Sequence, residues 1–160
     1  MEIIKADIND ARLVGYVHST AWKQAYVDIF PAEYLSTDTL DKRAHEFQES
    51  CINDGINYYL VYEKEKAVGI VKLMYINSEN YEIASFYILA EYRNKGYGGQ
   101  VMEYLKDMFD KANLYLWVLE ENRKARHFYE NNGFKNTGKT RRICRGNYYT
   151  QLQYEFVSEV

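Results

Sequence analysis

The chain alternates between two hydrophobic periods, one typical of strands and the other typical of helices. Its first part predicts a short strand over residues 2–6, a helix that ends near Tyr26, and a more polar helix over about 38–53. Either Asn9 or Asp10 is suited to cap the first of these helices. The apolar positions at helical spacing in that first helix are Leu13, Val14, Val17 and Ala21.

The middle of the chain predicts a β-hairpin and a third strand. Residues 58–62 and 68–76 are rich in β-branched and aromatic side chains, and the charged turn 63–66 separates them. After a polar turn at 77–80, a third strand covers 81–89.

The last third of the chain predicts a helix, a buried strand, a second helix and two closing strands. Residues 114–119 are almost continuously apolar, as in a parallel strand covered on both faces, so 81–119 is predicted to be a right-handed strand–helix–strand crossover. A helix runs from Asn122 to Gly133, and strands follow at about 134–144 and 147–157. The apolar stripe of the crossover helix, about three turns long, is Val101, Met102, Leu105, Met108 and Phe109.

Composition describes an ordered protein of modest charge. A chain of 160 residues with 47% hydrophobic residues fits one domain, taken as 1–160, which needs neither disulfides nor metals to hold a core. The 17 tyrosines require many rings in that core. A net charge of −3 argues against a general nucleic-acid binder, which needs a basic face.

Cysteines and histidines indicate neither a redox motif nor a metal site. Cys51 and Cys144 are far apart and outside any Cys-x-x-Cys spacing, so we expect buried or half-buried thiols. The histidines form no zinc-type cluster. With no secretion signal and no apolar run near ~18 residues, we expect a soluble, cytoplasmic protein without a membrane partner. A homodimer stays open.

A glycine-rich, cationic turn joins the strand at 81–89 to the next helix. The first N–H groups of a helix are unpaired and carry partial positive charge, so they attract phosphate oxygens. Gly96, Gly98 and Gly99 remove side chains from this approach, and Arg93 and Lys95 add charge. The turn therefore predicts an anion site.

Two common phosphate-binding motifs do not fit this turn. A P-loop needs Lys followed by Ser or Thr after the glycines, and the chain has neither pair there. A dinucleotide fingerprint needs a third glycine where Val101 stands. What remains is the pattern Arg93-x-x-Gly96-x-Gly98 between an apolar strand and an amphipathic helix.

Together with the segment 121–134, this pattern closely resembles the GCN5-related N-acetyltransferase (GNAT) family. The family's acyl-CoA loop, Arg/Gln-x-x-Gly-x-Gly/Ala, is matched at every fixed position. Two departures, Ala90 for a frequent Pro and Asn94 for a frequent Gly, concern the stiffness of the loop. A second family signature is matched by Asn122, Ala125, Phe128, Tyr129, Gly133 and Phe134.

The resemblance implies a fold and a cofactor. The fold is α/β (α+β), a mixed, twisted sheet of about seven strands flanked by about four helices. The co-substrate is acetyl-CoA, with its pyrophosphate on the N–H groups of 94–99, its pantetheine arm beside 81–89, and no metal. The cofactor-binding residues implied are Ile88, Arg93, Asn94, Lys95, Gly96, Tyr97, Gly98, Gly99 and Asn122.

Tyr129 and Glu82 are the predicted catalytic residues. Asn122 and Tyr129 are almost two helical turns apart, so they share a helix face at a spacing of about 10 Å. Tyr129 is suited to protonate the departing thiolate, although a core aromatic is the alternative. The resemblance implies an acidic base near Glu82, and an edge-exposed carboxylate is the alternative there. Strand alternation assigns Glu82, Ala84, Phe86 and Ile88 to one face, and Ile83, Ser85, Tyr87 and Leu89 to the other.

The acceptor is predicted to bind where the first helix ends. Trp22, Tyr26, Asp28 and Tyr34 suit a cationic amine, although a loop pinned by its own aromatics is the alternative. We therefore expect acetyl transfer to a primary amine of a small molecule, such as a polyamine or an amino-acid-like amine, by direct attack. The rivals are an acetyltransferase for protein N-termini or lysines, and a non-catalytic acyl-CoA sensor.

Overall fold

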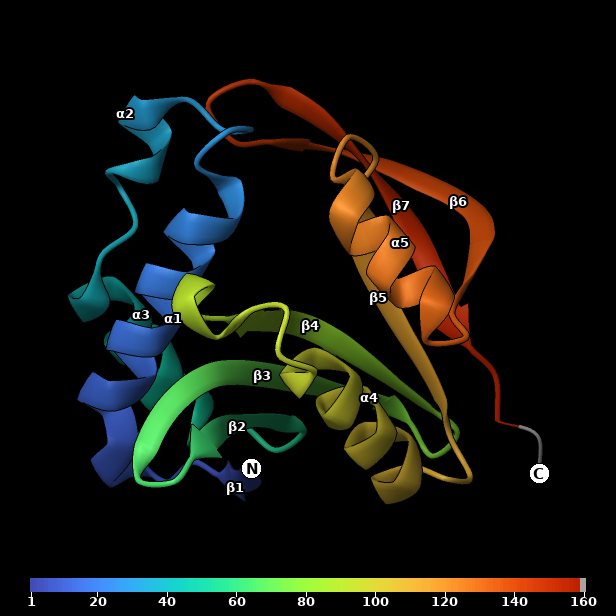
Figure 1. Cartoon of the computed structure of the whole chain (residues 1–160), viewed down its shortest axis with the longest axis horizontal. Coiled ribbons are helices and arrows are strands. Elements are labelled where there is room, and N and C mark those ends of the chain that lie inside the picture. The colour runs from blue at the N-terminus through green and yellow to red at the C-terminus, as the bar shows by residue number, and fades with distance from the viewer. Residues whose placement is uncertain (159–160) are drawn as a thin grey trace.

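The computed structural model describes residues 1–158 and contains a seven-stranded mixed sheet (Figure 1). The strands are β1 (Glu2–Lys5), β2 (Ile56–Glu63), β3 (Lys66–Asn77), β4 (Asn80–Ile88), β5 (Asn113–Leu119), β6 (Lys135–Cys144) and β7 (Tyr148–Phe156). Their order in the sheet is β1-β2-β3-β4-β5-β7-β6. The predicted strands are confirmed, as is the parallel pairing of β4 with β5.

Five α-helices flank this sheet, together with two short 3₁₀ turns at Ile8–Asp10 and Ala90–Tyr92. The helices are α1 (Ala11–Tyr26), α2 (Ala32–Leu35), α3 (Leu40–Ser50), α4 (Tyr97–Met108) and α5 (Arg123–Asn131). The sequence predicted about four, and the additional one is α2, a single turn too short to show a hydrophobic period.

Asp10, one of the two predicted candidates, holds the N-cap position of α1, but its side chain makes no capping hydrogen bond to that helix; the side chain that caps the preceding 3₁₀ turn is that of Asp7. Its carboxylate accepts a hydrogen bond from the N–H of Asn9 at 2.8 Å, and Asp10 in turn accepts one from the N–H of Asp7 at 2.9 Å. This reciprocal arrangement is a capping box. The predicted cap position is therefore confirmed for Asp10, whereas the capping hydrogen bonds are made at Asp7, because the segment opens with a 3₁₀ turn.

The two faces of the sheet carry separate hydrophobic clusters. On one face, α1 and α3 pack against β2 and β3 through residues such as Val14, Phe47 and Leu60. On the other face, α4 buries Val101 and Leu105, as the predicted apolar stripe required, and α5 packs beside it. The candidate site lies between these two layers, where β4 and β5 separate.

The parallel strands β4 and β5 pair only at their beginning. Residues 80–82 face residues 113–115, and beyond Glu82 the two strands separate, as Figure 1 shows. On its other side, β5 pairs with β7 in antiparallel fashion. Beyond Glu82, the facing edges of β4 and β5 therefore have no strand partner in each other, and the gap between them has room for a ligand.

A β-bulge in β4 changes the faces predicted for this strand. On β3, Lys72 and Leu73 are consecutive, but their partners are Ser85 and Ile83, so Ala84 is an extra residue. Such a bulge inverts the alternation beyond it.

The face assignment from simple alternation was therefore wrong. Ile83, Phe86 and Ile88 belong to the cluster beneath α4 and α5, whereas Tyr87 packs on the side of α1. Glu82 precedes the bulge and shares the α1 side with Tyr87. The predicted base thus lies on the face opposite to Phe86 and Ile88.

Both cysteines are exposed, contrary to the prediction. Cys51 follows the last turn of α3, and Cys144 ends β6, an edge strand, so neither is covered by a second layer. In residues 1–158, no helix combines the length and apolar character that crossing a membrane requires.

Candidate active site

Two cavities meet where β4 separates from β5. The larger cavity, about 1020 Å³, lies between β4, β5 and α5, and the smaller cavity, about 430 Å³, lies between the α1–α3 segment and the sheet. Tyr26, Ala84, Ser85 and Tyr87 line both, and we call these four residues the junction. The junction connects two compartments of different chemistry.

The larger cavity contains part of the predicted cofactor site. Ile88, Arg93, Asn94 and Asn122 line it, and so does Tyr129. The other residues predicted to bind the cofactor lie at the start of α4, outside the lining of this cavity. They are Lys95, Gly96, Tyr97, Gly98 and Gly99.

The glycine turn continues directly into the first turn of α4. The helix α4 begins at Tyr97, inside the glycine-rich segment, and the N–H of Gln100 donates to the carbonyl of Gly96 at 3.2 Å. Gly96 has a φ of 85° and Asn94 a φ of 60°, both left-handed conformations. Asparagine tolerates this region better than most residues, so Asn94 replaces a glycine at modest cost.

Gly98 and Gly99 differ in what surrounds them. A Cβ added to Gly98 would lie 3.1 Å from the ring of Phe128, so α4 and α5 approach each other closely at this point. A Cβ on Gly99 would meet nothing within 4 Å. Packing alone therefore explains a glycine at Gly98, whereas Gly99 opens onto free space at the N-terminus of the helix.

Arg93 links the turn to β4. Its Nε donates to the carbonyl of Ile88 at 3.1 Å, and burial lowers the pKa of the guanidinium. Arg93 also lines the larger cavity.

Asn122 both caps α5 and lines the larger cavity. Its side-chain oxygen accepts from the N–H of Ala125 at 3.3 Å, which leaves the amide NH₂ as a donor. Tyr129, two turns further, lines the same cavity.

The phenol of Tyr129 is half-buried beside two other rings. The ring centroid of Phe128 lies 5.3 Å away and that of Phe134 5.7 Å away. Burial raises the pKa of Tyr129, and the nearby Tyr26 raises it further. The hydroxyl is therefore protonated at neutral pH and can donate a proton or a hydrogen bond.

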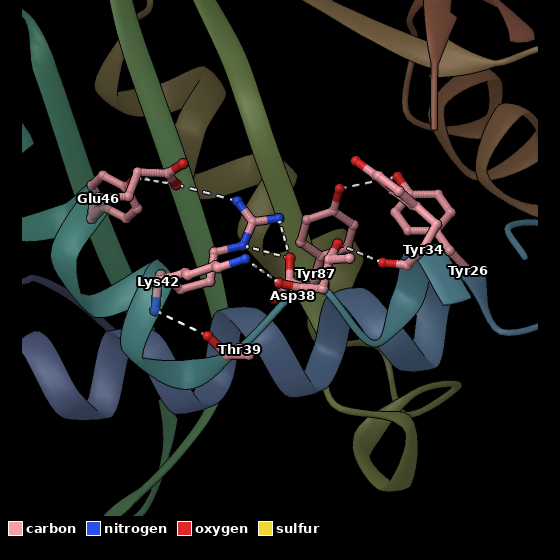
Figure 2. Close-up of polar contacts among 10 residues, drawn as sticks. Tyr26, Tyr34, Asp38, Thr39, Lys42, Glu46 and Tyr87 are labelled. Atoms are coloured by element: carbon pink, nitrogen blue, oxygen red, sulfur yellow. Dashed lines mark hydrogen bonds and ion pairs between the residues drawn. The ribbon is translucent and has the colours of Figure 1, made fainter. Parts of the chain in front are cut away.

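Tyr87 is a junction residue that sequence reasoning did not select. Its hydroxyl lies 3.0 Å from that of Tyr26, and Figure 2 shows the two turned toward each other. Burial raises the pKa of both phenols, and Tyr26 adds to the effect on Tyr87. The missing signal was the bulge at Ala84, because simple alternation placed Tyr87 on the face opposite to Glu82.

Aromatic rings form one side of the smaller cavity. Trp22, Tyr26 and Tyr34 line it together with Phe30, and the ring of Tyr26 stacks on Phe30 at 4.6 Å between centroids. The three aromatic residues predicted to bind the acceptor thus share one compartment. Asp28 is exposed in the turn after α1 and does not contribute to this lining.

The carboxylates of the smaller cavity are Asp38 and Glu46, and sequence reasoning selected neither. Arg43 binds both: its Nη2 lies 2.8 Å from Asp38 Oδ2, and its Nη1 lies 3.2 Å from Glu46 Oε1. Both carboxylates and Tyr87 line this cavity, and in the view of Figure 2 Asp38 is nearer to Tyr87 than Glu46 is. The other oxygen of Asp38, Oδ1, is buried and has no hydrogen-bond partner among residues 1–158.

Glu82 is the last residue of β4 that pairs with β5, and it lies two residues before Ala84, the first junction residue on this strand. It lines neither cavity. Burial lowers the pKa of Arg141, a residue of the smaller cavity, and the carboxylate of Glu82 opposes this effect, so Glu82 lies near Arg141. A bridging water would be needed to connect it with the junction.

The family model described as "Acetyltransferase (GNAT) family" matches residues 19–134. A spermidine N(1)-acetyltransferase of Thermoplasma acidophilum is 25% identical over 143 residues, which cover 84% of this chain and 88% of that protein. Solved structures show the same fold. The PaiA N-acetyltransferase of T. acidophilum in complex with coenzyme A superposes with a TM-score of 0.79 at 22% identity, covering 98% of each chain. A mutant form of the spermidine N-acetyltransferase SpeG from Vibrio cholerae has a TM-score of 0.74 at 19% identity, covering 98% of this chain and 93% of its own.

Proposed function

This chain belongs to the acetyltransferase (GNAT) family, and we propose that it transfers the acetyl group of acetyl-CoA to a primary amine of a small molecule. The observation that carries the proposal is the meeting of the two cavities at Tyr26, Ala84, Ser85 and Tyr87. A donor in one cavity and an acceptor in the other would react there without a covalent enzyme intermediate.

The larger cavity and the start of α4 suit acetyl-CoA. The first N–H groups of α4, Gly96 without a side chain and the positive charges of Arg93 and Lys95 are a suitable cradle for a pyrophosphate. Asn122 offers its amide NH₂ toward a pantetheine arm along β4. The acyl thioester supplies the activated carbonyl carbon. The similar PaiA structure, described as a complex with coenzyme A, supports this donor.

Tyr129 is proposed as the general acid. In water, proton transfer from a phenol of pKa ~10 to a thiolate whose thiol has pKa ~8.5 is a small uphill step; burial raises the pKa of Tyr129 and enlarges that step unless the thiolate is desolvated as well. Burial of Tyr129 keeps the phenol protonated, and the same dry surroundings raise the proton affinity of a thiolate formed beside it. The hydroxyl therefore donates to the sulfur as the carbon–sulfur bond breaks.

The amine is proposed to enter from the smaller cavity and to reach the junction as a neutral nucleophile. The paired hydroxyls of Tyr26 and Tyr87 can orient it. Glu82 remains the proposed base, and because it lies two residues before the junction, it would accept the proton through a water.

The smaller cavity favours a small acceptor over a protein. Aromatic residues from α1 and α2 wall it on one side, and its volume of about 430 Å³ suits a compact amine. Both a polyamine and an amino-acid-like amine are within this range. The name of the T. acidophilum relative, a spermidine N(1)-acetyltransferase, supports the polyamine.

The test is release of the coenzyme A thiol from acetyl-CoA in the presence of an amine panel. We expect thiol release that depends on an amine and that a Tyr129→Phe variant slows strongly. Binding of acetyl-CoA without release on any amine would instead indicate the sensor function.

A further inference from the structure

Resting on the proposed function, the geometry points to an acceptor that carries an acidic group, a carboxylate or a phosphate, at the end away from its reactive amine. We propose that Arg141 and Arg145 bind this group in the smaller cavity, while the amine lies at the junction. The acceptor would then be amino-acid-like rather than a polyamine.

The charged side chains that line the smaller cavity favour an acidic ligand. Four cationic side chains stand against two carboxylates, which leaves an excess of two positive charges. Arg43 already binds both carboxylates, Asp38 and Glu46. The three further cations are Lys42, Arg141 and Arg145.

These three cations make hydrogen bonds to neutral groups and, within residues 1–158, no ion pair. Lys42 Nζ donates to the carbonyl of Thr37 at 3.0 Å. Arg141 Nε donates to Gln151 Oε1 at 2.6 Å, and Arg145 Nη1 donates to the carbonyl of Cys144 at 2.8 Å. Each therefore keeps further donors and its full charge for an anion.

Arg141 and Arg145 come from the same hairpin and repel each other. Burial lowers the pKa of Arg141, the Glu82 carboxylate opposes this effect, and the charge of Arg145 lowers it further. The guanidinium of Arg141 is also oriented, because its Cζ lies 4.3 Å from the centroid of the Trp117 ring. An acidic group between the two guanidinia would relieve the repulsion through charge-assisted hydrogen bonds.

A polyamine finds little to bind in the same cavity. Its second ammonium needs an uncompensated carboxylate, but Arg43 neutralises the two that are present. Asp38 Oδ1 is the buried oxygen left without a partner in the described chain, and it can accept one N–H. Three nearby unpaired cations would repel the remainder of a polycation.

The test is a specificity panel of primary amines matched in length, with acetyl-CoA as donor and thiol release as readout. γ-Aminobutyrate is compared with putrescine, 5-aminovalerate with cadaverine, and phosphoethanolamine with ethanolamine. We expect kcat/KM for at least one acid-bearing amine to exceed that of its matched partner by on the order of 10-fold or more. The carboxylate and phosphate arms distinguish the two forms of the acidic group.

Variants on the hairpin localise the effect. Arg145→Gln should raise KM for acid-bearing amines by about 10-fold to 100-fold with little change in kcat, and Arg145→Lys should recover part of the loss. Arg142→Gln is the matched control, because Arg142 lies over the ring of Tyr148 and does not line the cavity. It should leave both parameters unchanged.

The outcomes separate the two proposals. Turnover of putrescine and cadaverine above their acid-bearing partners overturns this inference and leaves the proposed function standing. Equal effects of Arg145→Gln and Arg142→Gln also overturn it. Absence of thiol release from every amine overturns the proposed function and, with it, the assignment of an acceptor.

Discussion

Replacing Tyr129 by phenylalanine removes one oxygen from the centre of the proposed reaction. The ring contacts with Phe128 and Phe134 remain, since they involve the aromatic carbons. Loss of one half-buried hydroxyl should change the free energy of unfolding by no more than about 1 kcal/mol. Any large effect on turnover would then arise from the missing proton donor.

The size of that effect follows from the chemistry of the leaving group. General acid catalysis typically contributes about 10²- to 10⁴-fold, which corresponds to about 2.7 to 5.4 kcal/mol of activation free energy. Burial raises the pKa of Tyr129, so the phenol stays protonated up to at least pH 10. We therefore expect kcat to fall by about 10²-fold or more, with no compensating recovery between pH 6 and 9.

The assay is thiol release under saturating acetyl-CoA, with the affinity for acetyl-CoA measured separately by calorimetry. Tyr104→Phe is the matched control, because Tyr104 lies on α4 and is 38% exposed. A Tyr129→Phe variant that folds and keeps kcat within about threefold of the wild type would refute the acid role. A fall in kcat accompanied by an equal loss of acetyl-CoA affinity would indicate a binding role instead.

Three further predictions follow from the site and its surroundings. Glu82→Gln should lower kcat/KM by about 10-fold to 100-fold below the pKa of the amine and less above it; a pH–rate profile parallel to the wild type would contradict a base at this position. Gly99→Ala should keep acetyl-CoA affinity, because the proposed contact is a backbone N–H, and should raise stability by up to about 1 kcal/mol, as calorimetry and thermal melts can check. Burial and the charges of Arg43 and Lys72 lower the pKa of His18 well below 6.5, so the unfolded chain binds a proton more readily than the folded chain does. The free energy of unfolding should therefore fall as the pH drops below 6.5, and His18→Leu should reduce this dependence in denaturation measured across pH.

The sequence predicted the elements well where the pattern is local. The β-branched and aromatic run of β2 and the continuous apolar run of β5 are decided by residues within one strand, and both strands were confirmed. Gly133 was expected at the end of α5, and its φ of 89° is the left-handed conformation that a glycine adopts easily. The turn that begins at Arg93 was likewise found after β4, although residues 97–99 belong to the first turn of α4.

Prediction failed where contacts between distant segments decide the outcome. The bulge at Ala84 depends on how β3 and β4 pair, and no period within β4 reveals it. Without it, Tyr87 was assigned to the wrong face. The neutralisation of Asp38 by Arg43 also depends on how the start of α3 turns toward the cavity, so the charge available to an acceptor was not visible in the sequence.

Acetyl transfer to an amine can be tested directly by following acetyl-CoA, the amine and the intact protein by mass spectrometry in one reaction. We expect equal amounts of coenzyme A and N-acetylated amine, formed only when an amine is present. The mass of the protein should not change in acetyl-CoA alone. Direct acetyl transfer would be contradicted if no amine accelerated the formation of coenzyme A, or if the protein itself became acetylated and then passed its acetyl group to the amine.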